Sequence, residues 1–187
     1  MDSYFDIKAL PNAEILQSAV IAHLMQKLHR VLPQYCGRIG LSFPAYGQQR
    51  TLGGIIRVLG VKSDVEQIFQ QLSDMAAVKD YGLITQVNVI PLSVTKHVFF
   101  TRVHAKGKSR FERLKKRHLQ RGTWTSELEV AALDKMKQPL HLPHVSLKSA
   151  STGENFLLFL NRRMAGQPIE GVFNGYGISK TATVPWF

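Results

Sequence analysis

The sequence has a single cysteine, Cys36, among its 187 residues. One thiol can form neither a disulfide within the chain nor a thiolate zinc cluster, so disulfide-stapled folds and zinc-finger classes are excluded. His141 and His144 stand close together, but no partner motif accompanies them, and we expect no metal site there.

Long apolar runs are also missing. The longest aliphatic and aromatic run covers only residues 156–160, which is far too short to span a bilayer. The first residues, Met1 to Tyr4, lack the basic region and apolar stretch of a secretory signal. A composition of 44% hydrophobic residues is nevertheless sufficient for a packed core. We therefore expect a folded, cytoplasmic protein with no membrane partner.

Acidic residues are scarce: 13 Asp and Glu stand against 24 Lys and Arg, and the formal net charge is +11. Most of this excess lies in residues 102–121, where nine basic side chains accompany one acid, Glu112. From Ser109 to Arg121 the segment contains no proline or glycine, and Gly122 follows it. The pattern predicts a helix over residues 109–121, capped by Ser109 and Glu112 as a capping box.

Cationic and polar side chains recur along this helix at three- and four-residue steps, which places Arg110, Arg113, Arg117 and the pair Gln120 and Arg121 on one face. A solvated charged surface is the plain alternative. Like charges at this spacing repel one another, however, and a phosphate backbone relieves the repulsion. The pattern favours nucleic-acid binding. A DNA-binding transcription factor is disfavoured, because no helix-turn-helix spacing or dimerisation heptad is present.

The residue pattern predicts an α+β fold of two domains. Residues 1–92 read as strand, helix, strand, strand, helix, strand, the order of the ferredoxin-like split βαβ motif. Residues 93–187 read as a basic α+β RNA-binding domain that contains the Lys- and Arg-rich helix. The expected helices are 13–32, one capped by Ser63, 109–121 and 126–137, and the expected strands are 4–9, 37–43, 55–61, 84–90, 97–105, 144–149, 155–162 and 173–179.

Several polar residues lie outside the apolar pattern. His29 stands roughly 140° from the centre of the apolar stripe of its helix, near the helix C-terminus. Ser149, Ser151 and Thr152 form a small polar turn, and Tyr176 lies between two glycines. With the basic helix, these groups would suit RNA cleavage by the substrate's own 2′-hydroxyl, which needs a base, positioning groups and positive charge but no metal or cofactor. Each group also has a purely structural interpretation: His29 as a surface histidine, the serine turn as an ordinary loop, and Tyr176 as a half-buried aromatic residue.

Six motifs, in order along the chain, carry a more specific signal. They are K-L-H at residues 27–29, R-I-G-L-S-F-P at 38–44, R-V-x-A-K at 102–106, E-R-L-K-K-R at 112–117, S-A-S-T-G-x-x-F at 149–156 and the ending G-Y-G-I-S-K with V-P-W-F at 175–187. The sequence thereby resembles the type I-F CRISPR repeat-processing endoribonucleases, and the resemblance covers the whole chain.

The resemblance implies an enzyme that recognises the hairpin in each repeat of a precursor CRISPR RNA and cuts at its 3′ base without metal. It would leave a 2′,3′-cyclic phosphate and remain on its product, with other subunits of a type I-F surveillance complex as partners; free, it is expected to be a monomer. By resemblance, His29 is the general base, Ser149 positions the 2′-hydroxyl, and Tyr176 orients the histidine, with Ser151 and Thr152 as further support.

The resemblance also implies how RNA is read. Phe156 would stack on the terminal base pair, and Arg102 would read a guanine in the major groove. The remaining RNA contacts would come from His104, Lys106, Arg110, Arg113, Lys116, Arg117, Gln120 and Arg121.

Two departures from the family pattern concern specificity. His104 stands where a glutamine is usual, and it cannot grip adenine through two hydrogen bonds. Lys115, Lys116 and Gln120 stand where arginines are common, so forked guanidinium contacts are lost. We predict an altered base preference near the second base pair. The alternative function is binding of structured RNA without cleavage, since the basic helix would serve an endoribonuclease and a non-catalytic RNA-binding protein equally.

Overall fold

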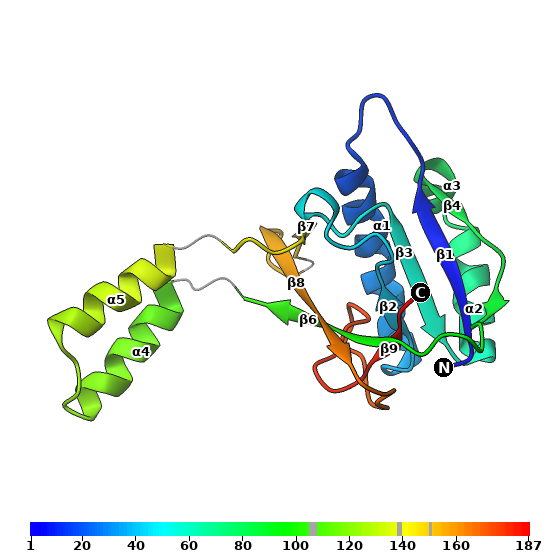
Figure 1. Ribbon diagram of the computed structural model, residues 1–187. Coiled ribbons are helices and arrows are strands. Elements are labelled where there is room, and N and C mark those ends of the chain that lie inside the picture. The colour runs from blue at the N-terminus through cyan, green and yellow to red at the C-terminus, as the bar shows by residue number, and fades with distance from the viewer. Residues whose placement is uncertain (105–107, 138–139, 150) are drawn as a thin grey trace. The chain divides into compact units, whose positions relative to one another are not determined.

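The computed structural model describes residues 1–104, 108–137, 140–149 and 151–187 (Figure 1). Its helices are α1 (Gln17–Val31), α2 (Lys62–Ser73), α3 (Ala76–Tyr81), α4 (Lys108–Gln120) and α5 (Ser126–Lys137). Its strands are β1 (Ser3–Ala9), β2 (Gly40–Ser42), β3 (Ile55–Gly60), β4 (Gly82–Ile84), β5 (Asn88–Val89), β6 (His97–Val103), β7 (His144–Lys148), β8 (Asn155–Ala165) and β9 (Val184–Pro185). The predicted α+β class is confirmed.

The chain forms two compact units. One contains Met1–Arg102 together with Leu142–Phe187, and the other contains Val103–His141. This division differs from the boundary expected at residue 92. The reason is that residues on both sides of position 92 share one core: the ring of Phe43 packs edge-on against that of Phe100, with centroids 5.1 Å apart.

The first sheet has the strand order β2-β3-β1-β4, and β5 also pairs with β1. All of these pairings are antiparallel. Along β1 the side chains of Phe5 and Ile7 are buried in the core, as the alternation predicts. The strand expected over residues 84–90 is divided into β4 and β5. The ferredoxin-like fold expected for residues 1–92 stays a prediction.

Helix α1 begins later than predicted. The Oδ1 atom of Asn12 accepts hydrogen bonds from the main-chain N–H groups of Glu14 and Ile15 and closes a short turn before the helix. Leu16 lies within the predicted helix range but is 77% exposed, and its extended backbone precedes the helix. The rest of the stripe is buried as predicted. Helix α2, by contrast, begins earlier than predicted, at Lys62, one residue before its expected cap, Ser63.

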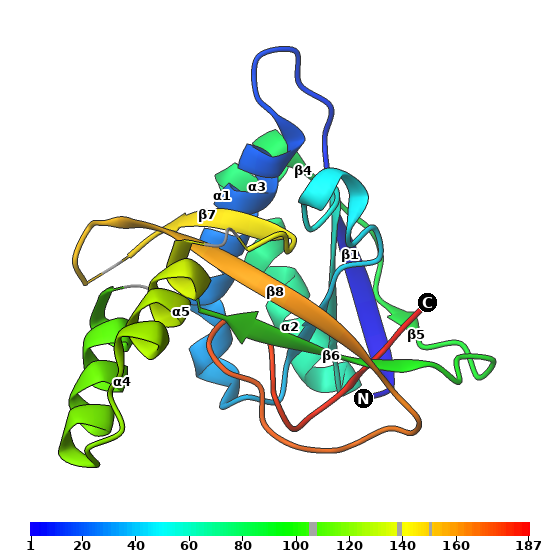
Figure 2. The same ribbon diagram turned by 60° about the vertical axis from the view of Figure 1, so that its left-hand side comes forward.

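The second sheet has the order β7-β8-β6-β9, so β7 lies at its edge. β7 packs against α1 and crosses it in Figure 2. The strand expected over residues 173–179 is not formed; these residues are a loop, and β9 pairs with β6 instead. The side-chain oxygen of Asn174 accepts turn hydrogen bonds from the N–H groups of Tyr176 and Ile178, and the backbone of Gly177 is left-handed, φ +68°; together these account for the difference.

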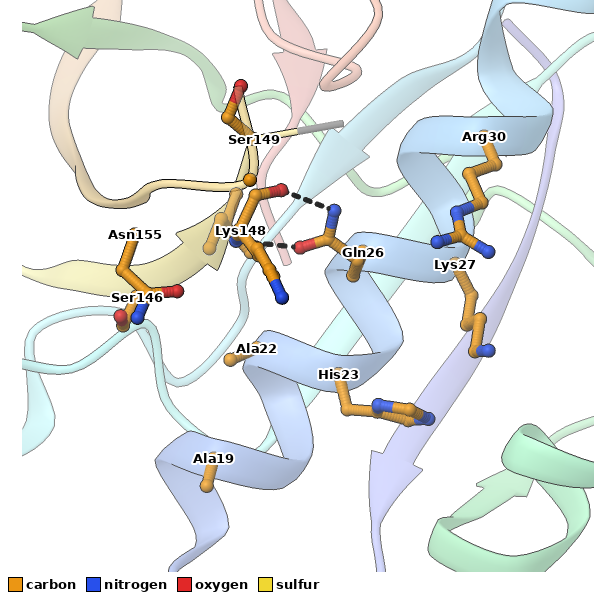
Figure 3. Close-up of a pocket in the computed structure, with 12 residues that line it drawn as sticks. Ala19, Ala22, His23, Gln26, Lys27, Arg30, Ser146, Lys148, Ser149 and Asn155 are labelled. Carbon is orange, nitrogen blue, oxygen red and sulfur yellow. Dashed lines mark hydrogen bonds between the residues drawn. The ribbon is translucent and has the colours of Figure 1, made fainter. Parts of the chain in front are cut away.

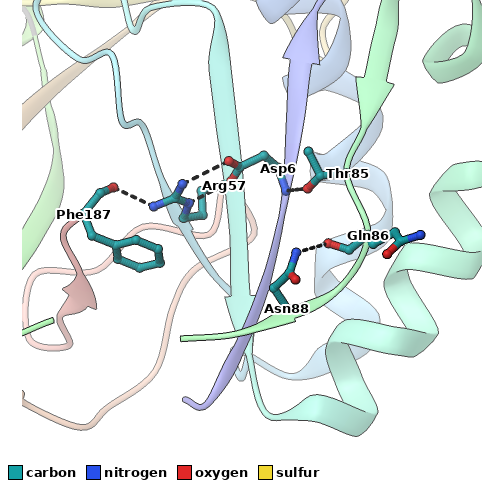
Figure 4. Close-up of polar contacts among 6 residues, drawn as sticks. All are labelled: Asp6, Arg57, Thr85, Gln86, Asn88 and Phe187. Carbon is teal, nitrogen blue, oxygen red and sulfur yellow. Dashed lines mark hydrogen bonds and ion pairs between the residues drawn. The ribbon is translucent and has the colours of Figure 1, made fainter. Parts of the chain in front are cut away.

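A buried ion pair joins the neighbouring strands β1 and β3 of the first sheet (Figure 4). The guanidinium of Arg57 donates to both carboxylate oxygens of Asp6, at 2.7 and 3.0 Å, and each side chain is only 10% exposed. Arg57 also donates to the main-chain oxygen of Phe187 and lies against the rings of Tyr4 and Phe187. This cluster fixes the last residues of the chain on the sheet.

The second unit is a hairpin of α4 and α5. Phe111 of α4 packs edge-on against Trp124 at 6.0 Å, and Lys115 bonds to Glu129 of α5 at 2.9 Å. α4 begins at Lys108, so Ser109 lies inside the helix rather than at its cap. The predicted range of α5 is confirmed. No described helix is both long and apolar enough to cross a membrane.

Candidate RNA-binding and catalytic site

His29 lies on α1, off the buried stripe and half-buried. Its Nδ1 atom is 2.7 Å from the main-chain carbonyl oxygen of Gly175. A carbonyl oxygen can only accept a hydrogen bond, so in this contact Nδ1 carries the hydrogen. In the neutral ring, Nε2 then has the free lone pair, which is the form that a general base requires.

Tyr176 covers one face of the imidazole. Its ring is stacked on that of His29, with centroids 4.0 Å apart and planes 4° apart. The loop that bears Tyr176 is held in place at two points. The side-chain oxygen of Asn174 accepts from the N–H of Tyr176 at 2.8 Å, and the N–H of Leu41 in β2 donates to the oxygen of Gly177 at 2.7 Å.

Two more of the predicted residues extend this row of rings. Phe156 at the start of β8 meets Tyr176 edge-on at 6.5 Å, and the guanidinium of Arg102 lies over the Phe156 ring at 5.2 Å. The Nε atom of Arg102 is buried and has no hydrogen-bond partner among the described residues. A buried donor left unsatisfied costs about 1–3 kcal/mol, and a guanidinium is a group that binds base edges and phosphates through paired donors.

The predicted serine turn is formed. The hydroxyl of Ser149 is 3.2 Å from that of Ser151 and accepts from the N–H of Thr152 at 3.3 Å. The N–H of Ser149 donates to the oxygen of Glu154 at 2.8 Å, which closes the base of the turn. The Ser149 hydroxyl is therefore held directly after the edge strand β7.

Gln26 ties this turn to α1 (Figure 3). Its side-chain nitrogen donates to the carbonyl oxygen of Lys148 at 2.7 Å, and its side-chain oxygen accepts from the N–H of Lys148 at 3.0 Å. Gln26 lies one helical turn before His29, and Lys148 directly precedes Ser149. One amide thus sets the distance between the element that bears His29 and the strand that leads into Ser149.

Four predicted RNA-binding residues come together on α4. Arg113, Lys116, Arg117 and Gln120 line one hollow of about 590 Å³. Lys115, on another side of the helix, is occupied: its bond to Glu129 raises the pKa of the Lys115 ammonium and lowers the pKa of the Glu129 carboxyl. α4 thus presents a cationic surface of its own.

The structure also places the other predicted RNA contacts, as far as it describes them. His104 is exposed, and Arg121 is exposed in the turn after α4. Lys106 and the side chain of Arg110 lie outside the described residues.

Comparison with known proteins identifies the family. A family model described as CRISPR-associated protein (Cas_Csy4) matches residues 4–187. The chain belongs to the Csy4 family.

Two curated relatives of the Csy4 family match over their full length. The chain is 32% identical over 190 residues to the CRISPR-associated endonuclease Cas6/Csy4 of Escherichia coli (strain UTI89 / UPEC). It is 33% identical over 191 residues to the CRISPR-associated endonuclease Cas6/Csy4 of Pseudomonas aeruginosa (strain UCBPP-PA14). Each alignment covers 100% of this chain and 100% of the relative. The resemblance drawn from six short motifs is confirmed at the level of the family.

Two features of the site could not be found in this Csy4-family sequence by pattern alone. The contact between His29 and Gly175 joins residues 146 positions apart, and that between Gln26 and Lys148 joins residues 122 positions apart. The only local signal was that Gln26, like His29, lies outside the apolar stripe. Among the described residues, no group of three or more His, Cys, Asp or Glu side chains is arranged to hold a metal ion.

Proposed function

We propose that this Csy4-family protein is a hairpin-specific endoribonuclease that processes precursor CRISPR RNA, cutting at the 3′ base of the repeat stem-loop without metal. The observation that carries the proposal is the 2.7 Å contact between Nδ1 of His29 and the oxygen of Gly175, because it leaves Nε2 free to act as a base. The names of the two relatives, both CRISPR-associated endonucleases, support it.

In the proposed reaction, Nε2 of His29 removes the proton from the 2′-hydroxyl of the nucleotide before the cut. The 2′-oxygen attacks phosphorus, the bond to the 5′-oxygen of the next nucleotide breaks, and that oxygen gains a proton from the imidazolium or from water. The products are a 2′,3′-cyclic phosphate and a free 5′-hydroxyl. Ser149 holds the attacking oxygen, and Tyr176 fixes the plane of the imidazole, which limits the loss of entropy at the transition state.

RNA recognition is assigned to two surfaces. The ring of Phe156 supplies a platform for the terminal base pair of the stem, and the guanidinium of Arg102 over that ring reads an acceptor beside it. The hollow of α4 binds phosphates of the stem through Arg113, Lys116 and Arg117. An A-form groove is normally too narrow for side chains to read, but the open end of a short hairpin admits a helix.

The same proposal covers the fate of the product. The protein, a monomer when free in the cytoplasm, stays bound to the mature hairpin and joins other subunits of a type I-F surveillance complex through it. Slow product release follows from a recognition surface that contacts the hairpin itself and keeps those contacts after the cut.

The test is cleavage of a labelled repeat hairpin in EDTA by wild type and by His29→Ala. We expect wild type to cut once at the 3′ base of the stem, and His29→Ala to bind equally well but to cut at least 100-fold more slowly, in the range for loss of a general base. Tight binding without cleavage by wild type would instead establish the non-catalytic RNA-binding alternative. Cleavage that needs added metal would contradict the mechanism.

A further inference from the structure

The side chain of Gln26 contacts the free edge of β7 at two points (Figure 3). Its amide donates to the carbonyl oxygen of Lys148 at 2.7 Å and accepts from the N–H of Lys148 at 3.0 Å. Because β7 is the edge strand of its sheet, main-chain groups that point away from β8 have no strand to pair with. At Lys148, the Gln26 amide supplies the donor and the acceptor that a neighbouring strand would otherwise supply.

The residue held in this way is the last one before the Ser149 turn. Successive residues of an antiparallel strand direct their main-chain groups to opposite edges. The N–H of Ser149 accordingly donates to the oxygen of Glu154, just before β8, while the main-chain groups of Lys148 face Gln26. Leu147, which is 3% exposed, anchors the strand in the core. The turn beyond Ser149 is exposed where the structure describes it, so its position depends on these last contacts of β7.

The other end of the contact lies next to His29. Ala19, Ala22 and Gln26 follow one another at three- and four-residue steps, the spacing of one helix face, and they line the same hollow beside β7. His29 is the next residue at this spacing, and it lies further along the helix by a rise of about 4.5 Å. One amide therefore connects a point one turn before His29 with a point one residue before Ser149.

We propose that Gln26 is a positioning residue for cleavage and that it acts through Ser149. The inference rests on the proposed function, in which Ser149 holds the 2′-oxygen that His29 activates. Both side chains must reach the same oxygen, and a misplacement of about 1 Å in such a geometry costs about 100-fold in rate. The two bonds from Gln26 prevent the Ser149 turn from shifting relative to α1. They therefore increase the rate of cleavage without contributing to RNA binding.

The experiment uses Gln26→Met, which keeps the length and the helix propensity of the side chain but supplies neither the donor nor the strong acceptor. Single-turnover cleavage of the all-ribose hairpin, with enzyme in excess, should slow by about fivefold to 150-fold, as expected for the loss of two hydrogen bonds. The Kd for the 2′-deoxy hairpin should stay within about twofold of wild type, because no contact with RNA is removed. Gln70→Met makes the same change at an exposed glutamine of α2, and it should cut at the wild-type rate.

A double-mutant cycle with Ser149→Ala tests whether Gln26 acts through Ser149. If it does, adding Gln26→Met to Ser149→Ala should slow cleavage further by less than about twofold, because the hydroxyl that Gln26 positions is already absent. A purely structural role would instead weaken both backgrounds alike. Losses that multiply in the double variant would overturn the inference.

Three other results would also overturn it: a wild-type rate for Gln26→Met, an equal loss in Gln70→Met, or a Kd that weakens as much as the rate. Wild type distinguishes the inference from the proposed function on which it rests. Failure of wild type to cut the all-ribose hairpin contradicts the proposed function and the inference with it. Cleavage by wild type, together with an undiminished rate in Gln26→Met, contradicts the positioning role alone.

Discussion

Gly175 is the glycine of the site at which one added carbon would touch His29 itself. A Cβ built there would lie 3.3 Å from Cε1 and 3.4 Å from Nδ1 of His29. Carbon atoms in good contact are about 3.5–4.0 Å apart, so the imidazole or the loop must move by a few tenths of an ångström. The movement stretches the 2.7 Å bond between Nδ1 and the Gly175 oxygen, which holds the ring with Nε2 free.

The size of the effect follows from that hydrogen bond. If Gly175→Ala removes the usual net contribution of about 0.5–1.5 kcal/mol from the correctly oriented ring, the cleavage step slows by about twofold to thirteenfold. Single-turnover cleavage with the enzyme in excess measures this rate. We expect the Kd for a 2′-deoxy hairpin to stay within about twofold of wild type, since Gly175 contacts Nδ1 of His29 and is none of the proposed RNA-binding residues.

Gly166→Ala is the matched control, because a Cβ there meets no atom within 4 Å and the residue is exposed. It is expected to cleave at the wild-type rate. A wild-type rate for Gly175→Ala, or an equal loss in both variants, would refute the assignment of the His29 tautomer to the Gly175 carbonyl.

Three further predictions concern specificity and stability. His104→Gln should shift the preferred base at the second base pair by about 1–3 kcal/mol, measured by cleavage of hairpins varied at that pair. Two hydrogen bonds from Arg38, one of 2.7 Å, lower the pKa of the Asp64 carboxyl from its ordinary value of 3.8. The stabilisation from this ion pair is present above that pH and is lost as the pH falls. Asp64→Asn should therefore cost stability at pH 7 and progressively less below pH 3.8. Asp6→Asn leaves Arg57 buried without its carboxylate and should lower the free energy of unfolding by about 3–5 kcal/mol in denaturant melts.

These outcomes have their own controls. Glu66→Gln removes an exposed pair with Lys62 at 3.8 Å and should change the free energy of unfolding by less than about 1 kcal/mol. If Asp6→Asn costs no more than Glu66→Gln, the buried pair does not hold the sheet face as inferred. Indifference of wild type and His104→Gln to the second base pair would remove the specificity argument. A deficit in Asp64→Asn that is equal at pH 7 and pH 3 would contradict the role of the ion pair.

Local patterns identified the elements but not their contacts. The ranges predicted for α5 and β3 agree with the structure to within one residue, and the apolar period located the buried stripe of α1 but not the start of that helix; it also left His29 outside the core, where the structure has it. Short elements were not predicted, because β9 has only two residues and therefore no period to detect. The loop around Asn174 was predicted as a strand, but side-chain hydrogen bonds that compete with strand pairing shape it. The boundary expected at residue 92 was inferred from charge alone, and charge carries no information on the core, which is continuous across that position.

The candidate site shows the same limit. His29, Tyr176, Phe156 and Arg102 were named from motifs, and the structure brings these four into one row of contacts. The atoms that hold the row belong to the main chain or to plain polar residues, such as the Gly175 oxygen and the Gln26 amide. Such contacts depend on how distant segments pack, and residue type alone does not specify them.

The proposed 2′-hydroxyl mechanism is tested most directly by replacing that hydroxyl with hydrogen at the nucleotide before the cut and analysing the ends of any product. The all-ribose hairpin should yield a 2′,3′-cyclic phosphate and a 5′-hydroxyl in EDTA, while the 2′-deoxy hairpin should bind with similar affinity and remain intact. Cleavage of the 2′-deoxy hairpin, or a 5′-phosphate on the downstream product, would contradict attack by the substrate's own hydroxyl and the role of His29 as its base.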